Sequence, residues 1–317
     1  MKGTYRIIVK NATVRYDFEI RRNITVLQGD SATGKTTLLE LINDYYELGP
    51  DSGIELTCDV ECAVVGGRDW KTSLIGVENR IIFIDEGNSF VLSDEFASLV
   101  KNSTNYYVIV SREGLPNLPY SVEEIYGIRT SGKYGSIKQV YNEFYHIYGD
   151  YDVRKSKSPA TIVCEDSNSG YEFWHNVCPN KEVISANGKS NIFDIVSDIE
   201  DSCLIIADGA AFGTEIGRLS KLLQHKKNIV IYLPESFEWL LLSAGVIQDT
   251  KINEILINPA DYIYSENYFS WERFFTGILV EATKGTHKAY SKAHLNSYYL
   301  NNIVQNSVKE KIIGIEL

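Results

Sequence analysis

Residues 23–36, Asn-Ile-Thr-Val-Leu-Gln-Gly-Asp-Ser-Ala-Thr-Gly-Lys-Thr, decide the expected fold. The stretch begins with a continuous apolar run, passes through a turn that contains two glycines, and enters residues 36–46, where apolar residues recur near helical spacing. An uninterrupted apolar run is typical of a central strand that is covered on both faces. The stretch therefore predicts a buried strand, a loop and a helix, in that order.

The loop fits the pattern G-x-x-x-x-G-K-[ST] at every fixed position, from Gly29 to Thr36. Its glycines let backbone N–H groups point at phosphate oxygens, and the helix N-terminus adds positive potential. We expect Lys35 to reach the β- and γ-phosphates of a nucleotide and the Thr36 hydroxyl to hold Mg²⁺. The predicted nucleotide-binding residues are Gly29, Asp30, Ser31, Ala32, Thr33, Gly34, Lys35, Thr36 and Thr37.

Two acids follow the next strongly apolar run, residues 80–84. A carboxylate at the C-terminal end of a parallel strand lies beside the phosphate loop, so Asp85 is expected to bind Mg²⁺, directly or through water. Glu86 is expected to orient or deprotonate the attacking water, which makes Lys35 and Glu86 the predicted catalytic residues of this half. Ser111-Arg112 end a third apolar run, where a γ-phosphate sensor and a simple strand-end turn are equally good interpretations.

Composition and length limit the remaining possibilities. The chain of 317 residues suggests about two domains. The net charge of −11 argues against binding nucleic acid through broad charge neutralisation, although metal-binding carboxylates would make a nuclease site acidic too. Five scattered cysteines, the absence of a signal-peptide pattern and the absence of a membrane-spanning apolar run predict a reduced cytoplasmic protein that has no membrane partner.

Apolar runs alternate with helical patterns along the chain, which predicts an α/β fold whose central sheet is mostly parallel. Residues 153–159 resemble an exposed linker. We therefore expect a phosphate-loop domain at 1–152 and a second, smaller α/β domain at 159–317, with a mostly helical tail. Residues 284–299 of that tail are basic and aromatic, and a solvated helix face is favoured there over a nucleic-acid contact.

Acidic residues also follow the short strands that are expected in the second half. The C-terminal ends of parallel strands converge on one crevice, and carboxylates gathered there repel one another unless they bind a divalent cation. Two metal ions so held could support phosphodiester cleavage. Glu165 and Asp208 are the predicted catalytic residues and metal ligands, with Glu235 or Glu238 as a third ligand. An ordinary α/β domain with acids at exposed strand ends is the alternative.

The first half, about residues 5–115, resembles the P-loop ATPases of the ABC and recombination-ATPase type. The resemblance rests on the alternating opening strands, on Gly29–Thr36 (the Walker A motif) and on Ile81–Glu86. It implies ATP and Mg²⁺ as ligands and leaves a homodimer open. The chain departs from the ABC pattern because it has neither the helical insert nor the Ser-Gly-Gly signature, and no switch histidine follows the third apolar run.

The second half, about residues 160–245, resembles a Toprim domain. Cys164–Gly170 resembles the opening strand with its catalytic glutamate, and Leu204–Ala210 resembles the Asp-x-Asp strand with Ala210 in place of the second acid. An ATPase followed by Toprim is the domain order of the overcoming-lysogenisation-defect (OLD) nucleases. The resemblance implies that nucleotide state controls a metal-dependent nuclease acting on DNA or RNA. The alternative is an ATP-dependent switch or scaffold whose inactive second domain binds a partner protein.

Overall fold

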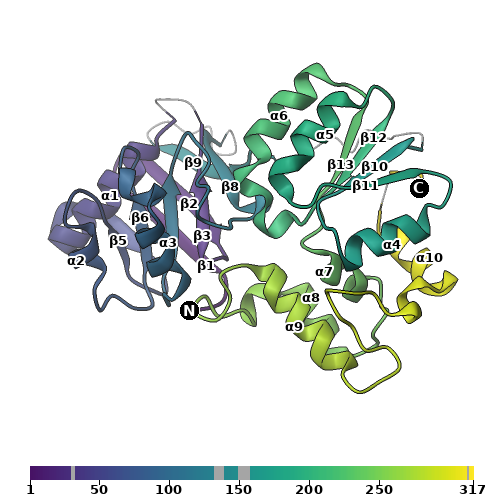
Figure 1. Ribbon diagram of the computed structural model, residues 1–317. Coiled ribbons are helices and arrows are strands. Elements are labelled where there is room, and N and C mark those ends of the chain that lie inside the picture. Colours follow the sequence, from purple (N-terminus) through teal and green to yellow (C-terminus); the bar gives the residue numbers. More distant parts are fainter. Residues whose placement is uncertain (30–32, 132–138, 149–157, 313) are drawn as a thin grey trace. The chain divides into compact units, whose positions relative to one another are not determined.

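A computed structural model describes residues 1–29, 33–131, 139–148, 158–312 and 314–317 (Figure 1). The chain forms two compact units. Unit 1 contains Met1–Tyr148 and Asn258–Phe269, and unit 2 contains Gly149–Ile257 and Ser270–Leu317. The expected linker at 153–159 lies mostly outside the described residues. The return of residues 258–269 to unit 1 has no counterpart in the predicted division into 1–152 and 159–317.

Unit 1 is built on one mixed sheet, which has nine strands among the described residues. Five neighbouring strands run parallel, and the strand of residues 24–27 lies among them. The opening hairpin, residues 5–20, is antiparallel. In sheet order the strands are β4 (Glu55–Thr57), β1 (Tyr5–Lys10), β2 (Val14–Ile20), β9 (Val140–His146), β8 (Ile125–Thr130), β3 (Ile24–Leu27), β7 (Tyr106–Val110), β6 (Ile81–Ile84) and β5 (Cys62–Val64).

The long helix α1 (Lys35–Leu48) begins directly after the phosphate loop and ends at Gly49-Pro50. Its apolar residues Leu38 and Ile42 are fully buried in the same core as strand residues such as Phe83, which fixes the helix start against the sheet. The other helices of unit 1 are α2 (Trp70–Leu74), α3 (Asp94–Lys101), η1 (Gly49–Ser52), η2 (Ser89–Leu92), η3 (Val122–Glu124) and η6 (Pro259–Asp261).

The described residues of unit 2 form a four-stranded parallel sheet whose strands are connected by helices. Its sheet order is β11 (Glu182–Ser185), β10 (Thr161–Cys164), β12 (Cys203–Ile206) and β13 (Ile229–Tyr232), close to the predicted ranges. The helices are α4 (Ser169–Val177), α5 (Ile192–Asp198), α6 (Ile216–His225), α7 (Phe237–Ser243), α8 (Thr250–Ile257), α9 (Trp271–Thr283), α10 (Asn302–Lys309), η4 (Lys189–Asn191), η5 (Gly209–Thr214) and η7 (Ser297–Leu300). The α/β prediction is therefore confirmed for both units.

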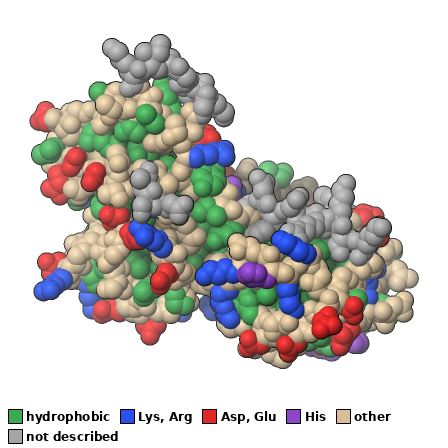
Figure 2. Space-filling view, turned by 90° about the horizontal axis from the view of Figure 1, so that it is seen from above, with side chains coloured by type: hydrophobic (Ala, Val, Ile, Leu, Met, Phe, Trp, Pro, Cys, Tyr) green, Lys and Arg blue, Asp and Glu red, His purple; other side chains and the backbone are tan. Residues whose placement is uncertain are grey.

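The surface carries charges of both signs. On the face shown in Figure 2, acidic and basic side chains lie interspersed among hydrophobic and neutral ones. Among the described residues, none of the helices combines the length and the apolar character that crossing a bilayer requires.

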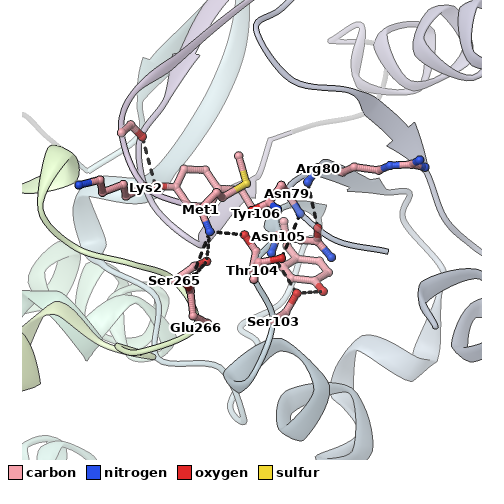
Figure 3. A network of polar contacts seen from close by, with 12 residues as sticks. Met1, Lys2, Asn79, Arg80, Ser103, Thr104, Asn105, Tyr106, Ser265 and Glu266 are labelled. Carbon is pink, nitrogen blue, oxygen red and sulfur yellow. Dashed lines mark hydrogen bonds and ion pairs between the residues drawn. The ribbon is translucent and has the colours of Figure 1, made fainter. Parts of the chain in front are cut away.

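Residues 258–269 join unit 1 through a polar network around the first residue of the chain (Figure 3). The Met1 amino group donates to the Thr104 carbonyl (2.6 Å) and to the Ser265 hydroxyl (3.0 Å), and it pairs with Glu266 (3.2 Å). Thr104 precedes β7, so the network lies at the end of the sheet where β6 and β7 begin. The phosphate loop follows β3 at the opposite end, because β3, β6 and β7 are parallel.

Candidate phosphate loop and acidic pocket

Glycines at both ends of the phosphate loop adopt backbone conformations that other residues rarely reach. Gly29 has a φ of 123° and Gly34 a φ of 92°. Asp30, Ser31 and Ala32 lie outside the described residues, so only the two ends of the loop are placed. Those ends leave β3 and enter α1 as the motif predicted, and Thr36 and Thr37 lie exposed in the first turn of α1.

Lys35 folds back over the loop. Its ammonium nitrogen donates to the Gly29 carbonyl (2.8 Å) and to the Thr33 hydroxyl (2.9 Å), and the residue is only 7% exposed. Burying a charge is unfavourable unless the charge is hydrogen-bonded, and the loop itself supplies oxygen acceptors here. Phosphate oxygens would give the same ammonium stronger, charge-assisted hydrogen bonds.

Tyr16 on β2 supports the loop, and the sequence analysis did not find it. Its hydroxyl donates to the Gly34 carbonyl (2.8 Å), and burial raises the pKa of Tyr16. A Cβ atom at Gly34 would lie 2.8 Å from the Tyr16 hydroxyl oxygen. Both the positive φ and the close approach of Tyr16 therefore require a glycine at position 34. The alternation of β2 predicts that Tyr16 points inward, but it does not reveal which loop lies there.

The predicted magnesium ligand and general base lie at the same sheet edge as the loop. Because β3, β7 and β6 are adjacent and parallel, the residues that follow them meet at one edge. The Ser111 N–H donates to the Leu27 carbonyl (3.1 Å), which ties the end of β7 to the end of β3. Asp85 follows β6, two strands or about 10 Å across the sheet from β3.

Glu86 pairs with Arg112, which follows β7 (2.6 Å, Nε to Oε1), and both side chains are exposed to solvent. The neighbouring Asp85 carboxylate accepts the Glu86 N–H (2.8 Å). The ion pair places Arg112 in direct contact with the predicted general base. It does not decide between a γ-phosphate sensor and a strand-end turn at Ser111-Arg112.

A pocket of about 240 Å³ opens in unit 2 at the ends of β10 and β12. Glu165 and Asp208 both line it, as the convergence of parallel strands predicted. The Glu165 carboxylate accepts the Asp208 N–H (3.1 Å), and the Asp208 carboxylate accepts the Phe237 N–H (3.1 Å). Glu235, a predicted metal ligand, is not among the lining residues, because it lies before α7 rather than at the pocket wall.

Two further charged residues that the sequence analysis did not assign line the same pocket. Glu272 lies in the first turn of α9, and Lys292 lies in a turn beyond that helix. The two side chains form an ion pair, and the Lys292 ammonium also lies 3.9 Å from the Glu238 carboxylate. Residues 284–296 do not form a helix, so the predicted solvated helix face is wrong for most of residues 284–299.

Glu238 is fully buried beside this pair. One of its oxygens accepts the Tyr290 hydroxyl (2.9 Å), and the other has no hydrogen-bond partner within the described ranges. The Tyr290 hydroxyl in turn lies 2.8 Å from the Ser169 hydroxyl at the start of α4. Of the two predicted third acids, the structure therefore brings Glu238, not Glu235, next to the cluster.

The pKa values in the pocket reflect crowded negative charge. Burial and the charges of Glu272, Glu238 and Glu165 raise the pKa of Asp208 well above its ordinary value, while Lys292 opposes the rise. Burial also raises the pKa of Glu165, against the hydrogen bond from the Asp208 N–H. Burial lowers the pKa of Lys292, but the charges of Glu238 and Glu272 outweigh it and raise that pKa overall.

Asp166 also lines the pocket, and its carboxylate has backbone partners. Asp166 accepts the N–H groups of Asn168 (2.8 Å) and Gly170 (2.7 Å) at the start of α4. Ala210, in place of an acid, is buried, and its N–H donates to the Glu235 carbonyl (3.1 Å). In the part of the chain that the structure describes, no group of three or more His, Cys, Asp or Glu side chains is arranged to hold a metal ion.

Comparison with known proteins adds no family. No protein-family model matches the chain, and a search of curated proteins finds no match.

Proposed function

We propose that unit 1 binds ATP and hydrolyses it with Mg²⁺. The observation that carries this proposal is the buried Lys35 ammonium, held by loop oxygens at the C-terminal edge of parallel strands. A parallel-strand edge followed by a helix N-terminus is an arrangement that binds anions. ATP is preferred over GTP because the chain lacks an Asn-Lys-x-Asp base-reading motif and because the first half resembles ATPases.

The residues at this edge suit a nucleotide and its metal. Lys35 would bind the β- and γ-phosphates. Thr36 and Asp85 would hold Mg²⁺, which prefers hydroxyl, carboxylate and water oxygens and would neutralise phosphate charge. Glu86 would orient the attacking water and accept its proton once the contact with Arg112 opens.

Phosphate release from ATP tests the proposal. Lys35→Ala should lower the rate at least 100-fold, because the charge-assisted hydrogen bonds to phosphate are lost, each worth about 1.5–3 kcal/mol. Lys101→Ala, at the exposed end of α3, is the matched control and should leave the rate unchanged. Equal rates for Lys35→Ala and wild type would contradict the proposal.

For unit 2 we propose that it acts as the nucleotide-controlled partner of unit 1. The chain passes between the units three times, after Tyr148, Ile257 and Phe269. Residues 258–269 belong to unit 1, and Glu272 of the acidic pocket follows only three residues later. This connection gives a covalent route by which nucleotide binding could alter the pocket.

Two functions of unit 2 follow from the sequence: metal-dependent cleavage of DNA or RNA, and binding of a partner protein by an inactive Toprim-like domain. Cleavage requires Glu165 and Asp208 to share divalent cations with a further acid. The residues present do not fit that requirement, because Lys292 pairs with the nearby acids and Ala210 supplies no carboxylate. We therefore favour the partner-binding switch.

Nicking of supercoiled plasmid distinguishes the two functions. The switch predicts no nicking with Mg²⁺ or Mn²⁺, with or without ATP. Nicking by wild type that is lost in Glu165→Ala would instead establish a nuclease. Glu182→Ala, at an exposed position of β11 in the same unit, is the control for general damage to the sheet.

A further inference from the structure

The acidic pocket of unit 2 contains its own cation. Four carboxylates line its wall: Glu165, Asp166, Asp208 and Glu272. Asp166 accepts N–H groups at the start of α4, and the other three form a cluster of four carboxylates with Glu238, which lies buried behind them. Each of the other three members of this cluster raises the pKa of Asp208 electrostatically, so its four carboxylates interact with one another. Buried carboxylates need a compensating positive charge, and Lys292 is the one cation among the lining residues.

Lys292 lies between two acids of the cluster, Glu238 and Glu272. Its ammonium pairs with Glu272 and lies 3.9 Å from Glu238. The remaining Glu238 oxygen is buried without a hydrogen-bond partner among the described residues. The Lys292 ammonium lies nearest the other Glu238 oxygen, which also accepts the Tyr290 hydroxyl, and it supplies positive charge to the carboxylate as a whole.

The backbone holds Lys292 at this place. The Ser169 N–H donates to the Lys292 carbonyl (3.2 Å), which ties the turn to the start of α4. Two residues earlier, the Tyr290 hydroxyl contacts both Ser169 (2.8 Å) and Glu238 (2.9 Å), and Tyr290 is buried. These hydrogen bonds attach the segment that carries Lys292 to α4 and α7, so the position of its backbone beside the cluster is fixed.

We propose that the Lys292 ammonium is the resident cation of this pocket and excludes a divalent metal ion from Glu238 and Glu272. The inference rests on the proposed function of unit 2 as a switch, and it explains physically why that unit would not cleave nucleic acid. Removing the ammonium leaves carboxylates that repel one another, and oxygen ligands of this kind bind divalent cations.

Mn²⁺ binding to the full chain, followed by the spin-resonance signal of the free ion without nucleotide, tests the proposal. Wild type should show no Mn²⁺ binding that depends on Glu272. Lys292→Met should gain one site at least 10-fold tighter than any in wild type, and Lys292→Met combined with Glu272→Gln should lose that site. Lys284→Met, at an exposed lysine of the same stretch, should gain nothing.

Several results would overturn the proposal. Wild-type Mn²⁺ binding that falls in Glu272→Gln or Glu165→Gln would show that the metal enters beside Lys292. A folded Lys292→Met protein that gains no site would show that the lysine excludes nothing. If Lys292→Met does not fold, Lys292→Arg takes its place in the test. Lys292→Arg keeps the positive charge and should gain no Mn²⁺ site. A gained site in that variant would contradict the proposal. Plasmid nicking without Mn²⁺ binding would contradict only the switch function.

Discussion

The positive φ of Gly34 in the phosphate loop can be tested by a single substitution. Gly34→Ala should weaken ATP binding at least ~10-fold, because a left-handed φ costs an alanine about 1–2 kcal/mol and the added Cβ meets the Tyr16 hydroxyl. Gly76→Ala shares the positive φ but has open space around it, so it should leave ATP binding unchanged. Equal affinities for the two variants, measured by titration with ATP and Mg²⁺, would contradict this role.

Glu86 is the residue whose loss should separate binding from chemistry. Glu86→Gln should lower the rate of ATP hydrolysis at least 100-fold, the usual contribution of a general base, while ATP binding stays close to that of wild type. Glu113→Gln, an exposed acid after the neighbouring strand, is the control. Parallel measurement of phosphate release and of ATP affinity checks the separation, and a Glu86→Gln protein with wild-type turnover would remove Glu86 from the site.

Asp208 gives unit 2 a specific pH dependence. Burial and neighbouring carboxylates raise its folded pKa above the ordinary value of 3.8, so stability falls as pH rises from 3.8 through the folded pKa. Asp208→Asn removes that loss and should raise the urea midpoint of unit 2 at pH 7, with a gain that shrinks towards pH 4. A variant that is less stable than wild type at pH 7, or a gain independent of pH, would contradict the assignment.

Helix α9 connects the core of unit 2 to the acidic pocket. It begins at Trp271, carries Glu272 into the pocket wall, and buries Phe275 completely. Phe275→Ala should lower the free energy of unfolding of unit 2 by about 3–5 kcal/mol, the usual result of emptying a buried aromatic position. Val280→Ala, on the exposed side of the same helix, should change it by less than about 1 kcal/mol. Hydrogen exchange resolves which unit is affected.

Elements with strong local signals were predictable from the sequence. The apolar runs at 24–27, 81–84 and 106–110 became buried parallel strands, because a strand covered on both faces needs apolar residues at every position. The strands β8 and β9 were not predicted, since their residues are mixed in character and lie in a stretch rich in glycine, tyrosine and serine. Their place beside β3 and β2 depends on pairing across the sheet.

The residues of the candidate sites likewise divide into those that the sequence predicted and those that it did not. Gly29, Lys35 and Thr36 are adjacent in sequence and follow from one local motif. Asp208 and Glu165 follow from the rule that parallel strand ends converge. Glu272 and Lys292 could not be predicted, because no local pattern connects them with strands more than 60 residues earlier, and only the fold brings these distant charges into one pocket.

At the scale of the whole molecule, the two units are joined by a chain that leaves and re-enters unit 1. A ligand that binds only the folded state stabilises the part that binds it. ATP with Mg²⁺ should therefore slow hydrogen exchange in α1 and at the ends of β3, β6 and β7. It should also slow exchange in α9, which belongs to unit 2 and follows residues 258–269, if nucleotide binding is transmitted to unit 2. Protection confined to unit 1 would retain the ATP site and contradict the proposed coupling.

Direct binding of ATP with Mg²⁺ to the full chain is the measurement that tests the proposed nucleotide site most directly. Wild type should bind one ATP per chain, and Lys35→Ala should bind at least 10-fold more weakly, because the buried ammonium is the cation of the loop. Lys101→Ala should bind as wild type does. A Lys35→Ala protein that binds ATP with wild-type affinity, or a wild-type protein that binds none, would contradict the assignment of this loop as a nucleotide site.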